Sequence, residues 1–180
     1  MSDVQFDNPT LVIDPPAGGF PVSPGWREDI LVAAGATAIS VLRAADGAVT
    51  EILTEPQITA EAYEAAATAV LKASLTAYAA RLRWKKEAGG IIVEGQAIAT
   101  DRESQALISG AYSLVQAQPE TIIQFKTRAG FVSLDAAQMS AIAVAVAKHV
   151  QACFGIEADA VAEIQSGSIT TPAEIDAAFV

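Results

Sequence analysis

Apolar residues recur at intervals of three and four along three long stretches of the chain, and this spacing predicts three helices. The first is expected from residue 60 to about residue 87, after an N-cap at Thr59 and before a stop at Gly89-Gly90. The second is expected from Asp101 to about Gln118, and the third from Asp135 to about Gln165. The apolar face predicted for the second helix comprises Leu107, Ile108, Ala111, Leu114 and Val115.

Short polar motifs mark where helices begin. Thr100 to Glu103 has the spacing of a capping box and is expected to open the second helix. Asp135 with Gln138 is expected to open the third. Thr171 to Glu174 is another capping box, with proline at the first helical position, and predicts a short last helix.

Runs of β-prone residues lie between the helices and predict short hairpins. Ile91–Val93 and Gln96–Ile98 flank the turn pair Glu94-Gly95. A second hairpin is expected from strands at 121–126 and 131–134. Asp46-Gly47 lies between β-prone residues of the stretch 37–54 and favours a third hairpin, although its alanines would also suit a short helix.

The beginning of the chain has a different pattern. Proline removes a hydrogen-bond donor and fixes φ, which excludes a helix or a central strand where prolines are frequent. Apolar residues are nevertheless scattered through this part, so we expect an extended arm that docks on a surface. Five of the eight prolines lie in the first 24 residues: Pro9, Pro15, Pro16, Pro21 and Pro24.

These elements together predict an α+β fold that is mainly α. An extended Pro-rich N-terminal arm is followed by long helices joined by short β-hairpins. We expect residues 1–58 to form the arm and a small β-hairpin region, and residues 59–180 to form a helical module with two short β-hairpins. The high alanine content gives little apolar area per helical residue, which favours a homo-oligomer.

Charge restricts the partners. The 21 acidic and 11 basic residues give a net charge of −10. Nucleic-acid binding depends on neutralising phosphates, so nucleic acid is not an expected partner. The longest uninterrupted apolar run, residues 141–147, is far shorter than the roughly 20 residues that span a bilayer, and the start of the chain lacks a targeting pattern. We therefore expect a soluble protein with no membrane insertion.

A single cysteine and a single histidine limit the chemistry of the chain. His149, Cys153 and Glu157 share one face of the third helix, but no second ligand cluster accompanies them. Their neighbours are apolar, so a core position is the favoured interpretation over a Cys–His nucleophile. We expect no metal, no cofactor and no catalytic residues.

The same helix carries apolar residues in a heptad-like seam. One interpretation is self-association through this seam; the other is packing on the first two helices. The seam consists of Met139, Ile142, Val146, His149, Cys153, Ile156 and Ala160.

Two polar strings have a functional and a structural interpretation. Arg81 to Lys86 mixes cations with Trp84, as single-strand nucleic-acid sites do, but cations also suit the end of a helix. Asp101 and Glu103 could act as acid or base, but acids also suit the start of a helix. The structural interpretation is favoured for both, and we expect the protein not to be an enzyme.

Several strings in a fixed order resemble an uncharacterised domain family of tailed-phage and prophage tail proteins, whose members are described as tail-fibre or tail-fibre-assembly proteins. The similarity covers about residues 80–166, and one departure is Phe125, where the family pattern often has tryptophan. The strings are Arg83-Trp84 with Gly89-Gly90, Thr100 to Gln105, Gly110 to Tyr112, Lys126, Gly130 to Val132, Leu134-Asp135, and His149 to Phe154.

The resemblance implies a phage tail context and no known enzymatic activity. The first hypothesis is a structural component of the distal tail or fibre region, located in the virion tail and in the host cytoplasm during assembly, with other tail or fibre proteins as partners. The alternative is a tail-fibre assembly chaperone that is absent from the mature particle. The N-terminal arm would dock on a neighbour through main-chain pairing.

Overall fold

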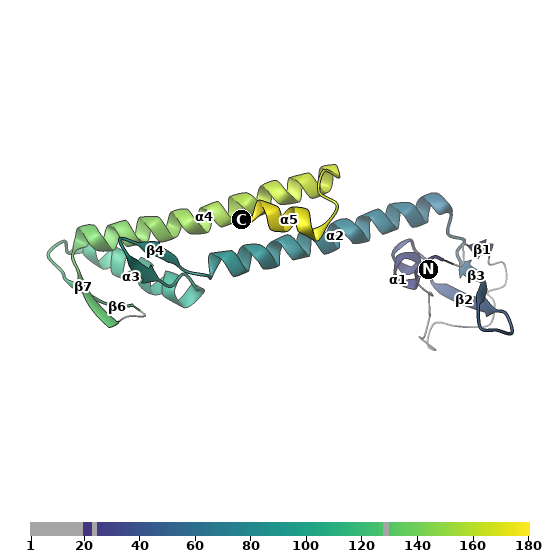
Figure 1. Cartoon of the computed structure of the whole chain (residues 1–180), viewed down its shortest axis with the longest axis horizontal. Coiled ribbons are helices and arrows are strands. Elements are labelled where there is room, and N and C mark those ends of the chain that lie inside the picture. Colours follow the sequence, from purple (N-terminus) through teal and green to yellow (C-terminus); the bar gives the residue numbers. More distant parts are fainter. Residues whose placement is uncertain (1–19, 23–24, 128–129) are drawn as a thin grey trace. The chain divides into compact units, whose positions relative to one another are not determined.

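The protein is known from a computed structural model that describes residues 20–22, 25–127 and 130–180 (Figure 1). The chain divides into two compact units, one up to Ser74 and the other from Leu75 onward. Within the described residues the protein is mainly helical, with five helices and short antiparallel strands. This confirms the mainly helical fold class; the N-terminal arm up to residue 19 lies outside the described residues.

The first unit contains a three-stranded antiparallel sheet. β2 (Ala38–Arg43) and β3 (Val49–Glu55) form the hairpin predicted around Asp46-Gly47, so the alternative of a short helix is wrong. β1 (Phe20–Val22) pairs with the other edge of β3 and gives the strand order β1-β3-β2. Pro21 therefore lies in an edge strand, where a residue without an N–H group is tolerated.

A short helix that the sequence did not predict completes this unit. α1 (Glu28–Ala33) buries Ile30 and Leu31. Trp26 stacks on Tyr63 with ring centroids 4.3 Å apart, and the Tyr63 hydroxyl accepts a hydrogen bond from the Arg27 backbone. The buried core of the unit consists of Ile30, Leu31, Ala36, Ile39, Ile52, Ile58, Tyr63 and Ala66.

Three of the predicted helices, α2, α4 and α5, are confirmed together with the residues that were predicted to cap them. α2 (Ala60–Glu87) has the expected bounds, and the Thr59 hydroxyl accepts from the Ala62 N–H at 3.2 Å. α4 (Ala136–Ser166) begins with a capping box formed by Asp135 and Gln138. α5 (Pro172–Ala178) begins with the predicted box formed by Thr171 and Glu174.

The predicted cap of the second helix is wrong. α3 (Arg102–Ala117) is capped by Asp101, whose carboxylate accepts from the Ser104 N–H at 3.0 Å. Thr100 is fully buried, and its hydroxyl instead accepts from the Gly90 N–H at 2.9 Å and donates to the Glu87 carbonyl. A hydroxyl that is engaged with the end of α2 is not available to cap α3.

Two hairpins flank α3 in the sequence. β4 (Ile91–Val93) and β5 (Gln96–Ile98) pair as predicted, and Glu94 and Gly95 have positive φ in the turn. β6 (Ile123–Thr127) and β7 (Gly130–Leu134) form the other hairpin, with strand bounds shifted by one or two residues from those predicted.

The second unit has two buried clusters. Ile108 and Val115 of α3 belong to the first, whereas Leu107 and Leu114 are 66% and 42% exposed, so the predicted apolar face of α3 is too wide. The first cluster comprises Ile98, Ile108, Val115, Leu134, Met139, Ile142 and Val146. The second comprises Leu75, Ala79, Ala160, Ile164, Ile169 and Ile175.

Candidate interaction surface

A buried ion-pair node joins α2, α3 and α4. Arg83 donates to Glu157 at 2.8 Å and to Glu87 one turn further along α2. The side chains of Arg83 and Glu87 are only 13% and 5% exposed. Glu87 also accepts a hydrogen bond from Gln105 of α3 at 3.2 Å. Each buried charge therefore has partners on neighbouring helices, which is what burial of a charge requires.

Ionisation of this node follows from its contacts. Burial raises the pKa of Glu87, but the hydrogen bonds from Gln105 and Arg83 outweigh it, so this pKa lies below its ordinary value. Burial lowers the pKa of Arg83, and the two carboxylates more than reverse this effect. Both groups are thus charged at neutral pH, and the node acts as a structural junction.

His149 and Cys153 lie beside the node and are part of the packing. The His149 Nε2 atom is 3.1 Å from the Lys86 carbonyl oxygen and 3.2 Å from that of Glu87, so this nitrogen donates to the end of α2. Cys153 is 1% exposed, and burial raises the pKa of its thiol. These contacts support the predicted core position, because a nucleophilic cysteine needs access and a stabilised thiolate.

The two polar strings also have structural roles. Within Arg81 to Lys86, Arg83 belongs to the ion-pair node, and Lys86 donates to the Phe179 carbonyl. Asp101 caps α3, and the Ser104 N–H lowers the pKa of its carboxyl group. Glu103 is exposed in the first turn of the same helix. Among the residues that the structure describes, no three His, Cys, Asp or Glu side chains are grouped to hold a metal ion.

The predicted seam of α4 is used within the second unit. Met139, Ile142, Val146, Cys153 and Ala160 are all buried there. This supports packing on neighbouring helices over self-association through the same residues.

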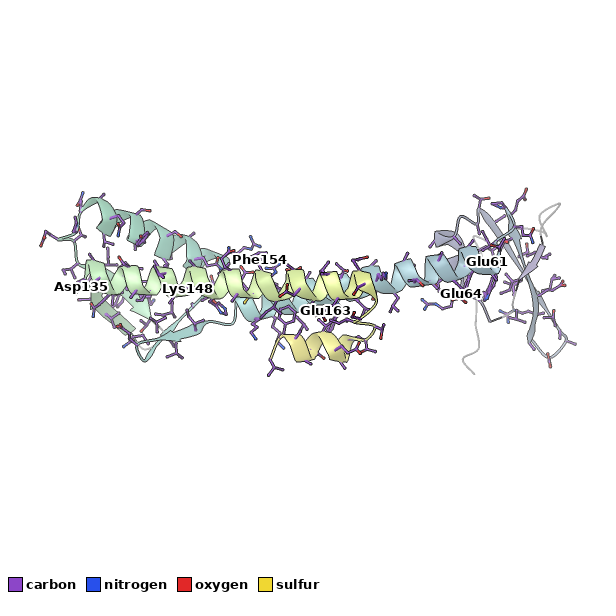
Figure 2. All side chains as sticks on the ribbon, turned by 90° about the horizontal axis from the view of Figure 1, so that it is seen from above. Glu61, Glu64, Asp135, Lys148, Phe154 and Glu163 are labelled. Carbon is purple, nitrogen blue, oxygen red and sulfur yellow. The ribbon has the colours of Figure 1, made fainter. Side chains whose placement is uncertain are left out.

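α4 is long and apolar enough to cross a membrane by length and composition, with 22% of its most apolar 18-residue window buried. The core helix of a water-soluble protein satisfies the same criteria, and α4 supplies buried residues to both clusters of its unit. Lys148 lies on this helix between Asp135 and Phe154 (Figure 2). The expectation of no membrane insertion remains a prediction.

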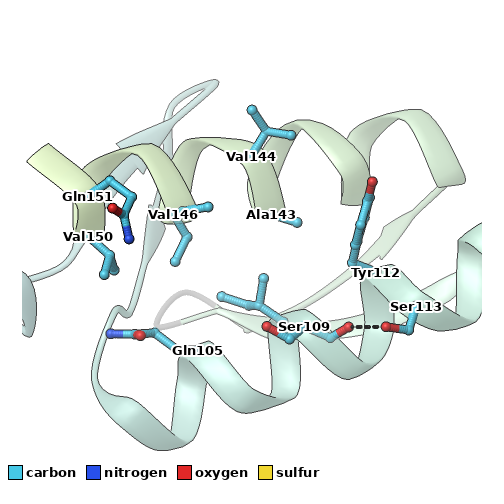
Figure 3. A pocket seen from close by; sticks show the side chains of 11 residues that line it. Gln105, Ser109, Tyr112, Ser113, Ala143, Val144, Val146, Val150 and Gln151 are labelled. Atoms are coloured by element: carbon cyan, nitrogen blue, oxygen red, sulfur yellow. Dashed lines mark hydrogen bonds between the residues drawn. The ribbon is translucent and has the colours of Figure 1, made fainter.

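A cavity of about 420 Å³ lies between α3 and α4 (Figure 3). Ile108, Val146 and Val150 give it apolar walls. Gln105, Ser109, Tyr112 and Gln151 add uncharged polar groups. Small side chains from both helices leave this space, because Ser109 and Ser113 of α3 and Ala143 and Ala147 of α4 are among the residues that line it.

A second cavity, of about 500 Å³, lies between α3 and the strands β5 and β6; we call it the hairpin groove. Its lining is mostly apolar. Leu107, which was predicted on the apolar face of the second helix, lines it and is 66% exposed. Lys126 of β6 also lines the groove and lies 5.8 Å from the Phe131 ring. The lining residues are Ala97, Ala99, Ser104, Leu107, Ala111, Ile123, Gln124, Phe125, Lys126 and Thr127.

The hairpin groove was not predicted from the sequence, although its residues were assigned to elements. It depends on how the two hairpins that flank α3 in the sequence lie against this helix in the fold. One feature of the sequence could have indicated the groove. The apolar face of α3 is wider than the stripe that a helix packed on one side buries, so some of its apolar residues had to remain exposed.

Comparison with known proteins gives one match. Residues 70–179, more than half of the chain, match the model of a family described as a domain of unknown function, DUF4376. No curated protein and no solved structure matches the chain. The matched segment contains α2 from residue 70 onward, the hairpins β4–β5 and β6–β7, and all of α3, α4 and α5, and thus the whole hairpin groove. The chain therefore belongs to the DUF4376 family.

Proposed function

We propose that the chain is a structural attachment component of a phage tail, in the distal-tail or tail-fibre region. The phage context rests on the resemblance of residues 80–166 to tail proteins. The attachment role rests on the hairpin groove, where apolar side chains are open to solvent. This role requires no reaction, and none is assigned to the chain.

Exposed apolar side chains of the second unit carry the attachment role. Leu107 is 66%, Phe131 71%, Ile92 70% and Ile122 55% exposed, and all four belong to α3, the hairpins or the loop before β6. A contiguous exposed apolar surface is typical of protein–protein contacts, and Leu107 lines the hairpin groove together with Ile123 and Phe125. The surplus of acidic residues elsewhere keeps such a protein in solution before assembly.

The alternative role, a tail-fibre assembly chaperone, uses the same surface. A chaperone binds fibre chains during assembly and leaves before the particle is complete. The net charge of −10 suits this role as well, because it keeps an exposed apolar surface in solution. Presence in the finished particle distinguishes the two roles.

Quantitative mass spectrometry of purified particles tests the proposal. A structural component is expected at a fixed copy number per particle, whereas a chaperone is expected in the lysate and absent from particles. In the same phage, Leu107→Ser is expected to reduce incorporation, with Thr68→Ser at an exposed position of α2 as the control. Absence from both particles and assembly intermediates would contradict both roles.

A further inference from the structure

The cavity between α3 and α4 has an uncharged lining (Figure 3). Its volume of about 420 Å³ lies in the range that is typical of small-molecule sites. The chain carries 21 acidic and 11 basic residues, yet none of them is among the described residues that line this cavity. A charged ligand would lose its hydration there without gaining a counter-ion, which is costly. The lining therefore favours an uncharged ligand.

Gln105 offers a hydrogen-bond acceptor that is fixed in advance. Its side-chain nitrogen donates to the Glu87 carboxylate at 3.2 Å and to the Thr100 carbonyl oxygen at 2.6 Å. Both partners are acceptors, so the orientation of the amide is determined and both of its hydrogens are used. The side-chain oxygen is left to accept from a ligand. Because the ion-pair node already holds this side chain, a ligand that bonds to it pays little of the entropy cost of ordering it.

The other polar groups of the cavity can both donate and accept. The side chains of Ser109, Tyr112 and Gln151 make no hydrogen bond within the part of the chain that the structure describes. Ser113 donates to the Ser109 carbonyl oxygen at 2.9 Å and keeps its own hydroxyl oxygen as an acceptor (Figure 3). Hydroxyl and amide groups match a ligand whose own groups donate and accept in turn.

The opposite side of the lining is apolar, because Ile108, Val146 and Val150 contribute only hydrocarbon. A neutral sugar ring combines a face of C–H groups with a rim of hydroxyl groups, each of which donates and accepts. We propose that the α3–α4 cavity binds a neutral sugar, with the C–H face against the two valines. The rim hydroxyls bond to the oxygen of Gln105 and to the hydroxyl of Tyr112. This site is separate from the hairpin groove and does not depend on the attachment role.

A nuclear magnetic resonance titration of the full-length chain tests the ligand class. The neutral probes are D-glucose, D-galactose and N-acetyl-D-glucosamine, and the charged controls are D-glucuronate and D-glucosamine, which keep the ring of glucose. At least one neutral probe is expected to shift the amide signals of residues 105–113 and 143–151, and the charged controls should bind roughly tenfold more weakly. No shift from any neutral probe, or equal binding of the charged controls, would overturn the proposal.

A variant that fills the cavity tests its location. Ala147 lines the cavity and is exposed, so Ala147→Leu adds volume there without crowding the core. Ala152→Leu is the matched control, since Ala152 is exposed on α4 but does not line the cavity. Ala147→Leu is expected to raise the Kd of the neutral probe roughly tenfold while the control leaves it unchanged. The same Kd in both variants would overturn the proposal, whether or not the protein is found in phage particles.

Discussion

At the scale of single residues, Arg83 is expected to make a large contribution to stability. It neutralises two carboxylates that are mostly buried, Glu87 and Glu157. Removing one partner of a buried ion pair leaves an uncompensated charge, so Arg83→Ala is expected to lower the free energy of unfolding by about 3 kcal/mol at neutral pH. Urea denaturation measures this. Lys85→Ala, an exposed cation two residues away, should stay within about 0.5 kcal/mol of the wild type.

Measurements at acid pH show whether the charge of Glu87 is responsible for the loss of stability in Arg83→Ala. Because its pKa is lower in the folded chain than in the unfolded one, its stabilising contribution is fully present above the unfolded value and is lost as pH falls through the folded one. The penalty of Arg83→Ala should therefore shrink as Glu87 is protonated, at pH values below the ordinary range of a glutamate carboxyl. A penalty that is constant from neutral to acid pH would show that lost packing, not charge, is responsible.

At the scale of elements, two glycines in different environments test why glycine occurs at each position. Gly90 has φ +87°, and a Cβ atom there would lie 3.0 Å from the Ile98 carbonyl oxygen. Gly90→Ala is expected to cost about 1–3 kcal/mol in the free energy of unfolding. Gly110 lies inside α3 with open space around it, so Gly110→Ala should stabilise by about 0.5–1 kcal/mol. Thermal unfolding of both variants measures these two effects. An unchanged stability of Gly90→Ala would contradict the close contact between residue 90 and the Ile98 carbonyl oxygen.

The elements also show what can be predicted from the sequence. Helix bounds and hairpins follow from local patterns: Thr59 caps α2, Gly47 turns a hairpin and Asp135 starts α4. The cap at Thr100 was wrong because its hydroxyl bonds to Glu87 and Gly90, ten or more residues earlier, and no local pattern contains that contact. The ion-pair node and the hairpin groove escaped prediction for the same reason.

At the scale of the whole molecule, the protein has separate cores on either side of Ser74, which should respond independently to mutation. Ile52 is fully buried in the core of the first unit, and Ile108 is 2% exposed in the second. Truncation of a buried isoleucine to alanine costs about 2–5 kcal/mol. Ile52→Ala should therefore destabilise the first unit, and Ile108→Ala the second.

Hydrogen exchange followed by mass spectrometry can locate each effect. Ile52→Ala is expected to speed exchange in β2 and β3 and to leave α4 unchanged, whereas Ile108→Ala should speed exchange in α3 and α4 and spare β2 and β3. The exchange of α2 amides is expected to differ between the two parts of this helix. Tyr63 and Ala66 belong to the first core, so amides near them should respond to Ile52→Ala. Leu75 and Ala79 belong to the second unit, so amides near them should not. Faster exchange throughout the chain in both variants would mean that α2 couples the units into one cooperative structure, and the two cores would then not be independent.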